Sequence, residues 1–392
     1  MQVTPIFPPF PLISASNKQK RSEKLARLRK KTYLCNANRK NWAFRPSYDN
    51  STRCAYHQNC RRVISLNMAN KASRTIQEQI DLLERRGMLF RNKDFAVGCL
   101  KRISYFRLKA YWWDMQRDPV NHIFNSGCYF EDVIERYEFD NALRKILFTA
   151  IDTIEIALRT KLIYHMSQAY GGLWYIDDNL FNNARQHASQ LLHLQKEFSE
   201  SGEVFAKDYR RQHPNQIQNG WQSDEDPDAW IILEVATLGD LSKLYKNIGH
   251  QLPAKAQIAN DFGLSIHSDL ASWLEAIAYL RNIVAHHSRL WSRNMVKRPS
   301  EPLNPQHTWL SRQLTDTEAK RPFCIITALL YLCDAVNPDN TLRKDIYHLL
   351  KKYRHLPMQR MGFFEGWQQE PVWQLPKGST SWQSVFTKLL RI

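Results

Sequence analysis

The stretch Phe130–Tyr170, FEDVIERYEFDNALRKILFTAIDTIEIALRTKLIYHMSQAY, decides the fold class of this 392-residue chain. Its apolar residues recur at the three-to-four-residue spacing that places side chains on one face of an α-helix. The apolar stripe consists of Val133, Ile134, Tyr137, Leu143, Ile146, Leu147, Ile151, Ile154 and Leu158. The pattern therefore predicts one long helix from Phe130 to about Tyr170, with this stripe buried against other elements.

The chain on either side of this stretch, from Ser73 onward, is also helical in pattern, and strand signals are nearly absent. Ser73 predicts the cap of a first helix, and Gly87 predicts its end. Asp226-Pro227 has the form of a cap followed by proline at the first helical position. Further helices are predicted at 92–103, 178–199, 203–211, 228–238, 240–247, 254–262, 268–287, 316–335 and 339–353. We therefore expect an all-α fold with no internal repeat.

Residues 1–67 differ from the rest of the chain in composition and charge. They hold 14 of the 55 Lys and Arg residues but only 2 of the 38 Asp and Glu residues, so most of the formal net charge of +17 lies there. We expect 1–67 to be a basic N-terminal extension, either a flexible tail or residues upstream of a true start at Met68, and 68–392 to form the helical domain. The alternative is an arm that binds nucleic acid, because Lys and Arg attract polyanions.

The cysteines and the N-terminal residues indicate the cellular compartment of the protein. The seven cysteines are odd in number and include no C-x-x-C pair, which argues against a disulfide framework. Residues 1–16 lack the basic start and unbroken apolar core of a signal peptide. No apolar stretch reaches the roughly 20 residues that a membrane helix needs. We therefore expect a cytoplasmic protein with no membrane partner.

Two groups of residues bear on metal binding. Cys35, Cys54, His57 and Cys60 could offer zinc three thiolates and an imidazole, but their spacing matches no common zinc finger or ribbon. The acidic residues at 177–178 and 224–228 could be imagined as Mg²⁺ ligands, yet loops and helix caps explain them better. We expect neither a metal nor another cofactor.

The stretch Leu270–Arg293, LASWLEAIAYLRNIVAHHSRLWSR, joins an amphipathic helix to a group of polar side chains at its end. Asn282 and His286 are four residues apart and so share a helical face, and Arg281 is flexible enough to reach His286. The apolar side of the helix consists of Leu270, Trp273, Leu274, Ile277 and Leu280. A guanidinium, an amide and an imidazole thus come together beside an apolar anchor.

These residue types suit metal-free cleavage of RNA. An imidazole titrates near neutral pH, so it can take a proton from a ribose 2′-hydroxyl or give one to the leaving 5′-oxygen. A guanidinium can bind a phosphate through two hydrogen bonds and stabilise the charge of the transition state. Asn282 could hold the imidazole tautomer or a phosphate oxygen. Because cleavage profits from a separate acid and base, we expect a homodimer with two facing motifs.

A purely structural alternative explains the same residues. Arg281 would form an ion pair and His286 a hydrogen bond in the core, at a helix end where cations are favourable in any case.

The surrounding sequence resembles the Abi-like (abortive infection) family of the HEPN superfamily, a group of bacterial phage-defence proteins. The motif has the form R-N-x-x-x-H followed by H-x-R-L-W. Four further blocks are similar to segments of that family: 103–112 (ISYFRLKAYW), 137–144 with 154–160 (YEFDNALR and IEIALRT), 230–245 (W-x-x-x-E-x-x-T-x-G-x-L-S) and 361–367 (MGFFEGW). The resemblance covers roughly residues 70–375. Ser104 stands where the family usually has glycine, and Val284 and Ser292 replace common Cys and Asn residues.

The resemblance implies a HEPN-like multi-helix bundle with additional helices, dimerisation across the motif helices, and a metal-independent ribonuclease site of Arg281, Asn282 and His286. Relatives of this kind include toxins of toxin–antitoxin pairs, and some associate with a small non-coding RNA. The expected partners are therefore substrate RNA, a second copy of the chain, and a small non-coding RNA or an antitoxin. The alternative is a non-catalytic RNA-binding module that has kept the fold.

Four residues around the motif are expected to bind RNA: His287, Arg289, Arg293 and Arg107. The three that follow the motif lie where a bound strand would emerge. Arg107 stands among aromatic residues that could stack on single-stranded RNA. The alternative is that these aromatic residues belong to the core, with Arg107 paired to a buried carboxylate such as Glu234.

Overall fold

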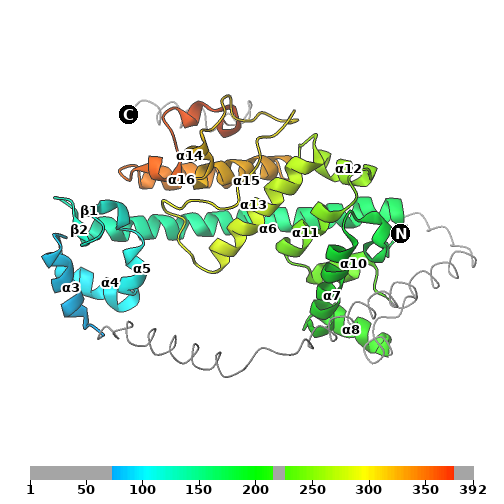
Figure 1. Ribbon diagram of the computed structural model, residues 1–392, viewed down its shortest axis with the longest axis horizontal. Coiled ribbons are helices and arrows are strands. Elements are labelled where there is room, and N and C mark those ends of the chain that lie inside the picture. Colours follow the sequence, from blue (N-terminus) through cyan, green and yellow to red (C-terminus); the bar gives the residue numbers. More distant parts are fainter. Residues whose placement is uncertain (1–72, 215–225, 375–392) are drawn as a thin grey trace, which may run out of the picture. The chain divides into compact units, whose positions relative to one another are not determined.

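The computed structural model describes residues 73–214 and 226–374 and is almost entirely helical in these parts (Figure 1). The chain divides into two compact units. The smaller one includes helix α8 (Val204–Gln212), and the larger one holds every other helix discussed below. The all-α prediction is therefore confirmed. The extension predicted at 1–67 lies outside the described residues.

Helix α6 (Phe130–Tyr170) is the central element of the larger unit. It has the bounds that its periodicity predicts, and it ends at Gly171, whose φ of 80° few other residues adopt readily. Several helices pack against it, four of them most extensively, and Figure 1 shows α13 crossing it at an angle. These four are α12 (Pro253–Asp261), α13 (His267–Ala285), α15 (Pro322–Val336) and α16 (Leu342–Lys352).

Helix α15 is buried on all sides, since every residue from Pro322 to Cys333 is buried. A helix that is apolar all round belongs in the middle of a core. Within the described residues, no helix is both long and apolar enough to cross a membrane. Around the start of α15 and the end of the described chain, the rings of Phe323, Phe363, Trp367 and Trp373 pack against one another.

The elements before α6 form a small layer of helices and one hairpin. Helix α3 (Ile76–Arg85) begins at a capping box of Thr75 and Glu78, two residues later than the predicted cap Ser73. The elements that follow are α4 (Lys93–Arg102), α5 (Tyr105–Lys109), the 3₁₀ turn η2 (Trp113–Met115), β1 (Gln116–Asp118) and β2 (Ile123–Phe124). The two strands pair antiparallel, with Gln116 opposite Phe124. They are too short for a strand pattern to predict them.

Helix α7 (Ala184–Glu200) is followed in the larger unit by a helix that is shorter than predicted. Helix α10 spans only Ala229–Ile232 with Asp228 as its N-cap, and the 3₁₀ turn η5 (Leu233–Val235) follows it. The next helix, α11 (Leu238–Asn247), starts here because Thr237 and Asp240 form a capping box. The prediction of one helix over 228–238 is therefore wrong: α10 ends at Ile232, and Ala236 is extended before the cap of α11.

The segment predicted as one helix over 316–335 is also divided. A short helix α14 (Asp316–Ala319) precedes α15, which starts with Pro322 at its first position. Proline lacks the N–H that a continuous helix would need there, so it starts a new helix. Five 3₁₀ turns complete the described chain: η3 (Trp174–Ile176), η4 (Asp178–Leu180), η6 (Met358–Met361), η7 (Trp367–Gln369) and η8 (Pro371–Trp373).

Candidate functional site at the end of α13

The motif lies at the carboxyl end of α13, where the chain leaves the helix in a defined turn. The Ser288 N–H donates to the Ile283 carbonyl (2.9 Å), and the His287 N–H donates to the Val284 carbonyl (3.0 Å). This pair of bonds is a Schellman motif, which requires its C′ residue in the left-handed region. That residue is His287, with φ 53°. A residue with a Cβ adopts this conformation only when its surroundings hold it there.

The three predicted catalytic residues lie at this helix end on the outer side of α13. Arg281 is half-buried, and Asn282 and His286 are exposed. Among the residues that the structure describes, none of the three side chains forms a hydrogen bond or an ion pair. The ion pair and core hydrogen bond of the structural alternative are therefore not found in the described part of the chain. All three groups are available to a ligand.

Their support is apolar and tightly packed. Trp273, Leu274, Ile277 and Leu280 are fully buried on the other side of α13, against α6 and neighbouring helices. The Trp273 indole N–H also donates to the Ser300 carbonyl (2.9 Å). This packing holds α13 in place. The positions of the three polar groups therefore depend on where the helix ends.

The segment after the helix is held by a buried carboxylate, that of Asp140 on α6. Its oxygens accept hydrogen bonds from the Leu290 N–H (3.0 Å), the Trp291 N–H (2.7 Å) and the Tyr111 hydroxyl (2.7 Å). Arg144, one helical turn along α6, forms an ion pair with the same carboxylate. Burial raises the pKa of Asp140, and Arg144 and the hydrogen-bond donors oppose that rise.

Arg107 forms a contact that its sequence position does not predict. Its Nη2 donates to the carbonyl of His287, and its guanidinium lies 5.9 Å from the centre of the Tyr137 ring. The alternative pairing with Glu234 is wrong, because Glu234 lies 4.0 Å from Arg159 instead. Arg159 also bonds Glu155 (3.2 Å), the intrahelical pair that their four-residue spacing favours.

The other predicted RNA contacts differ in their surroundings. Arg289 donates to the Trp291 carbonyl, and its burial lowers its pKa. Arg293 donates to the Arg289 carbonyl at 3.1 Å. The side chain of His287 is exposed and forms no hydrogen bond or ion pair with the described residues. Three of the four predicted RNA-binding side chains thus contact main-chain carbonyls, and their binding of RNA stays a prediction.

The aromatic residues around Arg107 divide between core and surface. Tyr111 and Trp112 are buried, as the core alternative expects. Phe106 is 83% exposed and Trp113 is 55% exposed. The sequence therefore predicts the composition of this cluster but not which rings face solvent.

No group of His, Cys, Asp and Glu residues within 73–214 and 226–374 is placed to hold a metal ion. Asp177 accepts from the Asn179 N–H (3.2 Å) at the start of η4, and Asp228 is the N-cap of α10, so these two acidic residues lie at helix starts. The zinc alternative of Cys35, Cys54, His57 and Cys60 lies outside the described residues.

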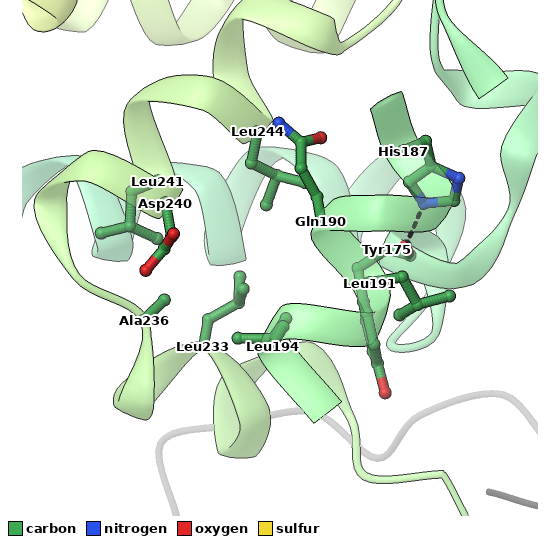
Figure 2. Close-up of a pocket in the computed structure, with 10 residues that line it drawn as sticks. All are labelled: Tyr175, His187, Gln190, Leu191, Leu194, Leu233, Ala236, Asp240, Leu241 and Leu244. Atoms are coloured by element: carbon green, nitrogen blue, oxygen red, sulfur yellow. Dashed lines mark hydrogen bonds between the residues drawn. The ribbon is translucent and has the colours of Figure 1, made fainter. Parts of the chain in front are cut away.

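A shallow pocket exists elsewhere in the larger unit, and Figure 2 shows the side chains around it. Leucines dominate its lining. The His187 Nε2–H donates to the Tyr175 carbonyl oxygen (2.7 Å), and burial lowers the pKa of His187. The pocket contains none of the motif residues. The lining residues are Tyr175, His187, Gln190, Leu191, Leu194, Leu233, Ala236, Asp240, Leu241 and Leu244.

The role of Asp140 is not among the predictions from the sequence, although its position in the helix indicates that it is buried. Asp140 lies seven residues after Val133 and seven before Leu147, in phase with the buried stripe of α6. A carboxylate at such a position must find partners in the core, because an unpaired buried charge is costly. The contact of Arg107 with His287 spans 180 residues of sequence, and no local pattern indicates it.

Comparison with known proteins bears on the same region. Residues 98–292 match the model of the Abi-like protein family. The matched stretch runs from within α4 to the residue after Trp291, so it includes Arg107, Asp140 and the whole motif. Neither the curated proteins nor the solved structures yielded a match. Residues 98–292 of this chain are therefore similar to the Abi-like protein family.

Proposed function

We propose that this protein is a metal-independent endoribonuclease that acts in abortive infection, with Arg281, Asn282 and His286 as its catalytic residues. The Abi-like family suggests the biological setting. One observation supports the chemistry: at the end of α13, three polar side chains suited to phosphate chemistry have no partner among the described residues. Other polar groups nearby, such as Asp140 and Arg107, are engaged.

The proposed reaction needs a base, an acid and a group that stabilises charge. His286 takes the proton of the ribose 2′-hydroxyl, and the 2′-oxygen attacks the adjacent phosphorus. The bond from phosphorus to the 5′-oxygen breaks, and that oxygen receives a proton from a second imidazole. Arg281 binds the phosphate oxygens as negative charge builds on them. The products are a 2′,3′-cyclic phosphate and a 5′-hydroxyl.

The second imidazole is the reason to propose a homodimer of HEPN type. Two copies that face each other across the ends of their α13 helices would supply two histidines to one phosphate. The exposed position of His286 and Asn282 allows such an approach. A small non-coding RNA or an antitoxin is the proposed regulator, because an unrestrained ribonuclease would harm its own cell.

Product chemistry tests the proposal. The purified full chain is incubated with 5′-labelled RNA in EDTA and, in parallel, in Mg²⁺. We expect cleavage in both, with fragments that end in 2′,3′-cyclic phosphate. Cleavage only with Mg²⁺, or fragments that end in 3′-hydroxyl, would exclude the mechanism. Binding of RNA without cleavage would favour the non-catalytic RNA-binding module instead.

A further inference from the structure

We infer that Arg107 is a positioning residue for the motif: its guanidinium fixes the exit of α13, and thereby His286, and does not serve as an RNA contact. This inference rests on the proposed function for its consequence in catalysis. The structural part of the inference, that Arg107 fixes the turn after α13, does not depend on RNA cleavage.

The first support is the place of the bond. Arg107 donates to the main-chain carbonyl of His287, the residue directly after His286. His287 is the left-handed residue of the Schellman motif, and that conformation ends the helix at Ala285. A donor on the carbonyl of this residue stabilises the turn in which His286 is the C-cap of α13. Without it, the turn would relax toward conformations that a β-carbon tolerates better.

The second support is that Arg107 itself is fixed. The Ser104 side chain caps helix α5 by accepting from the Arg107 N–H (3.2 Å). The Tyr137 ring, which projects from α6, lies beside the guanidinium. Arg107 thus links α5 and α6 to the end of α13. A side chain held at both its backbone and its head group is suited to positioning a partner.

The third support is a second anchor only a few residues further along. Asp140 binds the N–H groups of Leu290 and Trp291, so the exit segment Ser288–Arg289 lies between two fixed points. Asp140 is fully buried and paired with Arg144, so its replacement would disturb the core. Arg107 is only partly buried, and it is the anchor that can be altered with less risk to the fold.

The test compares Arg107→Met with a matched control, Lys101→Met. Lys101 is an exposed cation on the neighbouring helix α4, so the control removes a positive charge from the same region. Two properties are measured on the full chain: hydrogen exchange of the amides at 286–291, and the kcat and KM for cleavage of a labelled RNA. Arg107→Lys and added guanidinium serve as rescue measurements.

For Arg107→Met we expect faster exchange of the His287 and Ser288 amides. We also expect kcat to fall by at least about tenfold, a change of about 1.4 kcal/mol in the barrier, with KM and the salt dependence of binding unchanged. Guanidinium or Arg107→Lys should restore part of kcat, and Lys101→Met should change neither property.

The contrary result is unchanged exchange together with a raised KM and a smaller salt slope, which would make Arg107 an RNA contact. The exchange measurement needs no catalysis. If the parent chain does not cut RNA, the proposed function fails, while faster exchange in Arg107→Met still supports the positioning role and unchanged exchange overturns it.

Discussion

The backbone of His287 sets the geometry of the motif at the scale of single residues. Its φ of 53° lets the chain turn out of α13 directly after His286, and Arg107 and Asp140 hold the segment on either side. A non-glycine residue in the left-handed region costs about 1–2 kcal/mol relative to ordinary helical or extended backbone. The neighbouring contacts offset that cost.

Two substitutions at His287 separate its backbone role from its side chain. His287→Gly adopts the left-handed conformation without strain, whereas His287→Ala keeps the Cβ and loses the imidazole. We expect the glycine variant to be more stable than the alanine variant by about 1 kcal/mol, as measured by urea denaturation. Equal stability of the two variants would mean that the turn does not depend on this conformation.

RNA binding by the same two variants reports on the imidazole. Since both lack it, an equal loss of RNA affinity would assign His287 the RNA contact that the sequence predicts.

The helices differ in how well the sequence predicts them. Helix α6 is predictable because apolar residues recur every three or four positions along most of its 41 residues and no helix breaker interrupts them. Errors occur where a local cap interrupts an apolar pattern, at Thr237 and at Pro322. Periodicity reports which face of a helix is buried, but the capping residues decide where it starts. The short strand pair β1–β2 carries too few residues for any period.

The residues of the candidate site also differ in how well the sequence predicts them. Arg281, Asn282 and His286 can be placed on one helix end from their spacing alone, because that spacing is local. The contacts that hold this end come from α5 and α6, which are remote in sequence. Their identification requires the tertiary structure, although the in-phase Asp140 signals that a buried partner must exist.

Burial of His187 on helix α7 makes the stability of the protein depend on pH. His187 is buried against the ring of Phe181, at 3.9 Å between ring centres, and burial lowers its pKa below the usual 6.5, although Asp177 and Asp178 oppose this shift. Between the usual and the lowered pKa, the unfolded chain binds a proton that the folded chain does not. The free energy of unfolding therefore falls as pH falls below about 6.5, by at most about 1.4 kcal/mol per pH unit for this group.

The variant His187→Gln should reduce that acid sensitivity, because glutamine can donate to the Tyr175 carbonyl and does not titrate. The comparison is urea denaturation at pH 7.5 and pH 5, with His193→Gln, an exposed histidine on the same helix, as the control. The same loss of stability on acidification in His187→Gln and the parent would show that this histidine is not responsible.

At the scale of the whole molecule, net charge is a poor guide to the site. Most of the excess of +17 lies in residues 1–67, outside the described structure, while the proposed chemistry depends on three side chains at one helix end. The match to the Abi-like family covers the elements that build this end and not the basic segment. The proposed chemistry therefore depends on the site and not on the total charge.

The most direct test of the central claim is the RNA cleavage rate of His286→Ala and Arg281→Ala in EDTA, relative to the parent. His193→Ala and Arg185→Ala, both on the surface of α7, serve as controls for loss of an imidazole and of a positive charge. We expect each motif variant to lose about 10²–10⁴-fold in rate with unchanged helicity and oligomeric state, and the controls to match the parent. Cleavage by both motif variants at the parental rate would contradict the assignment.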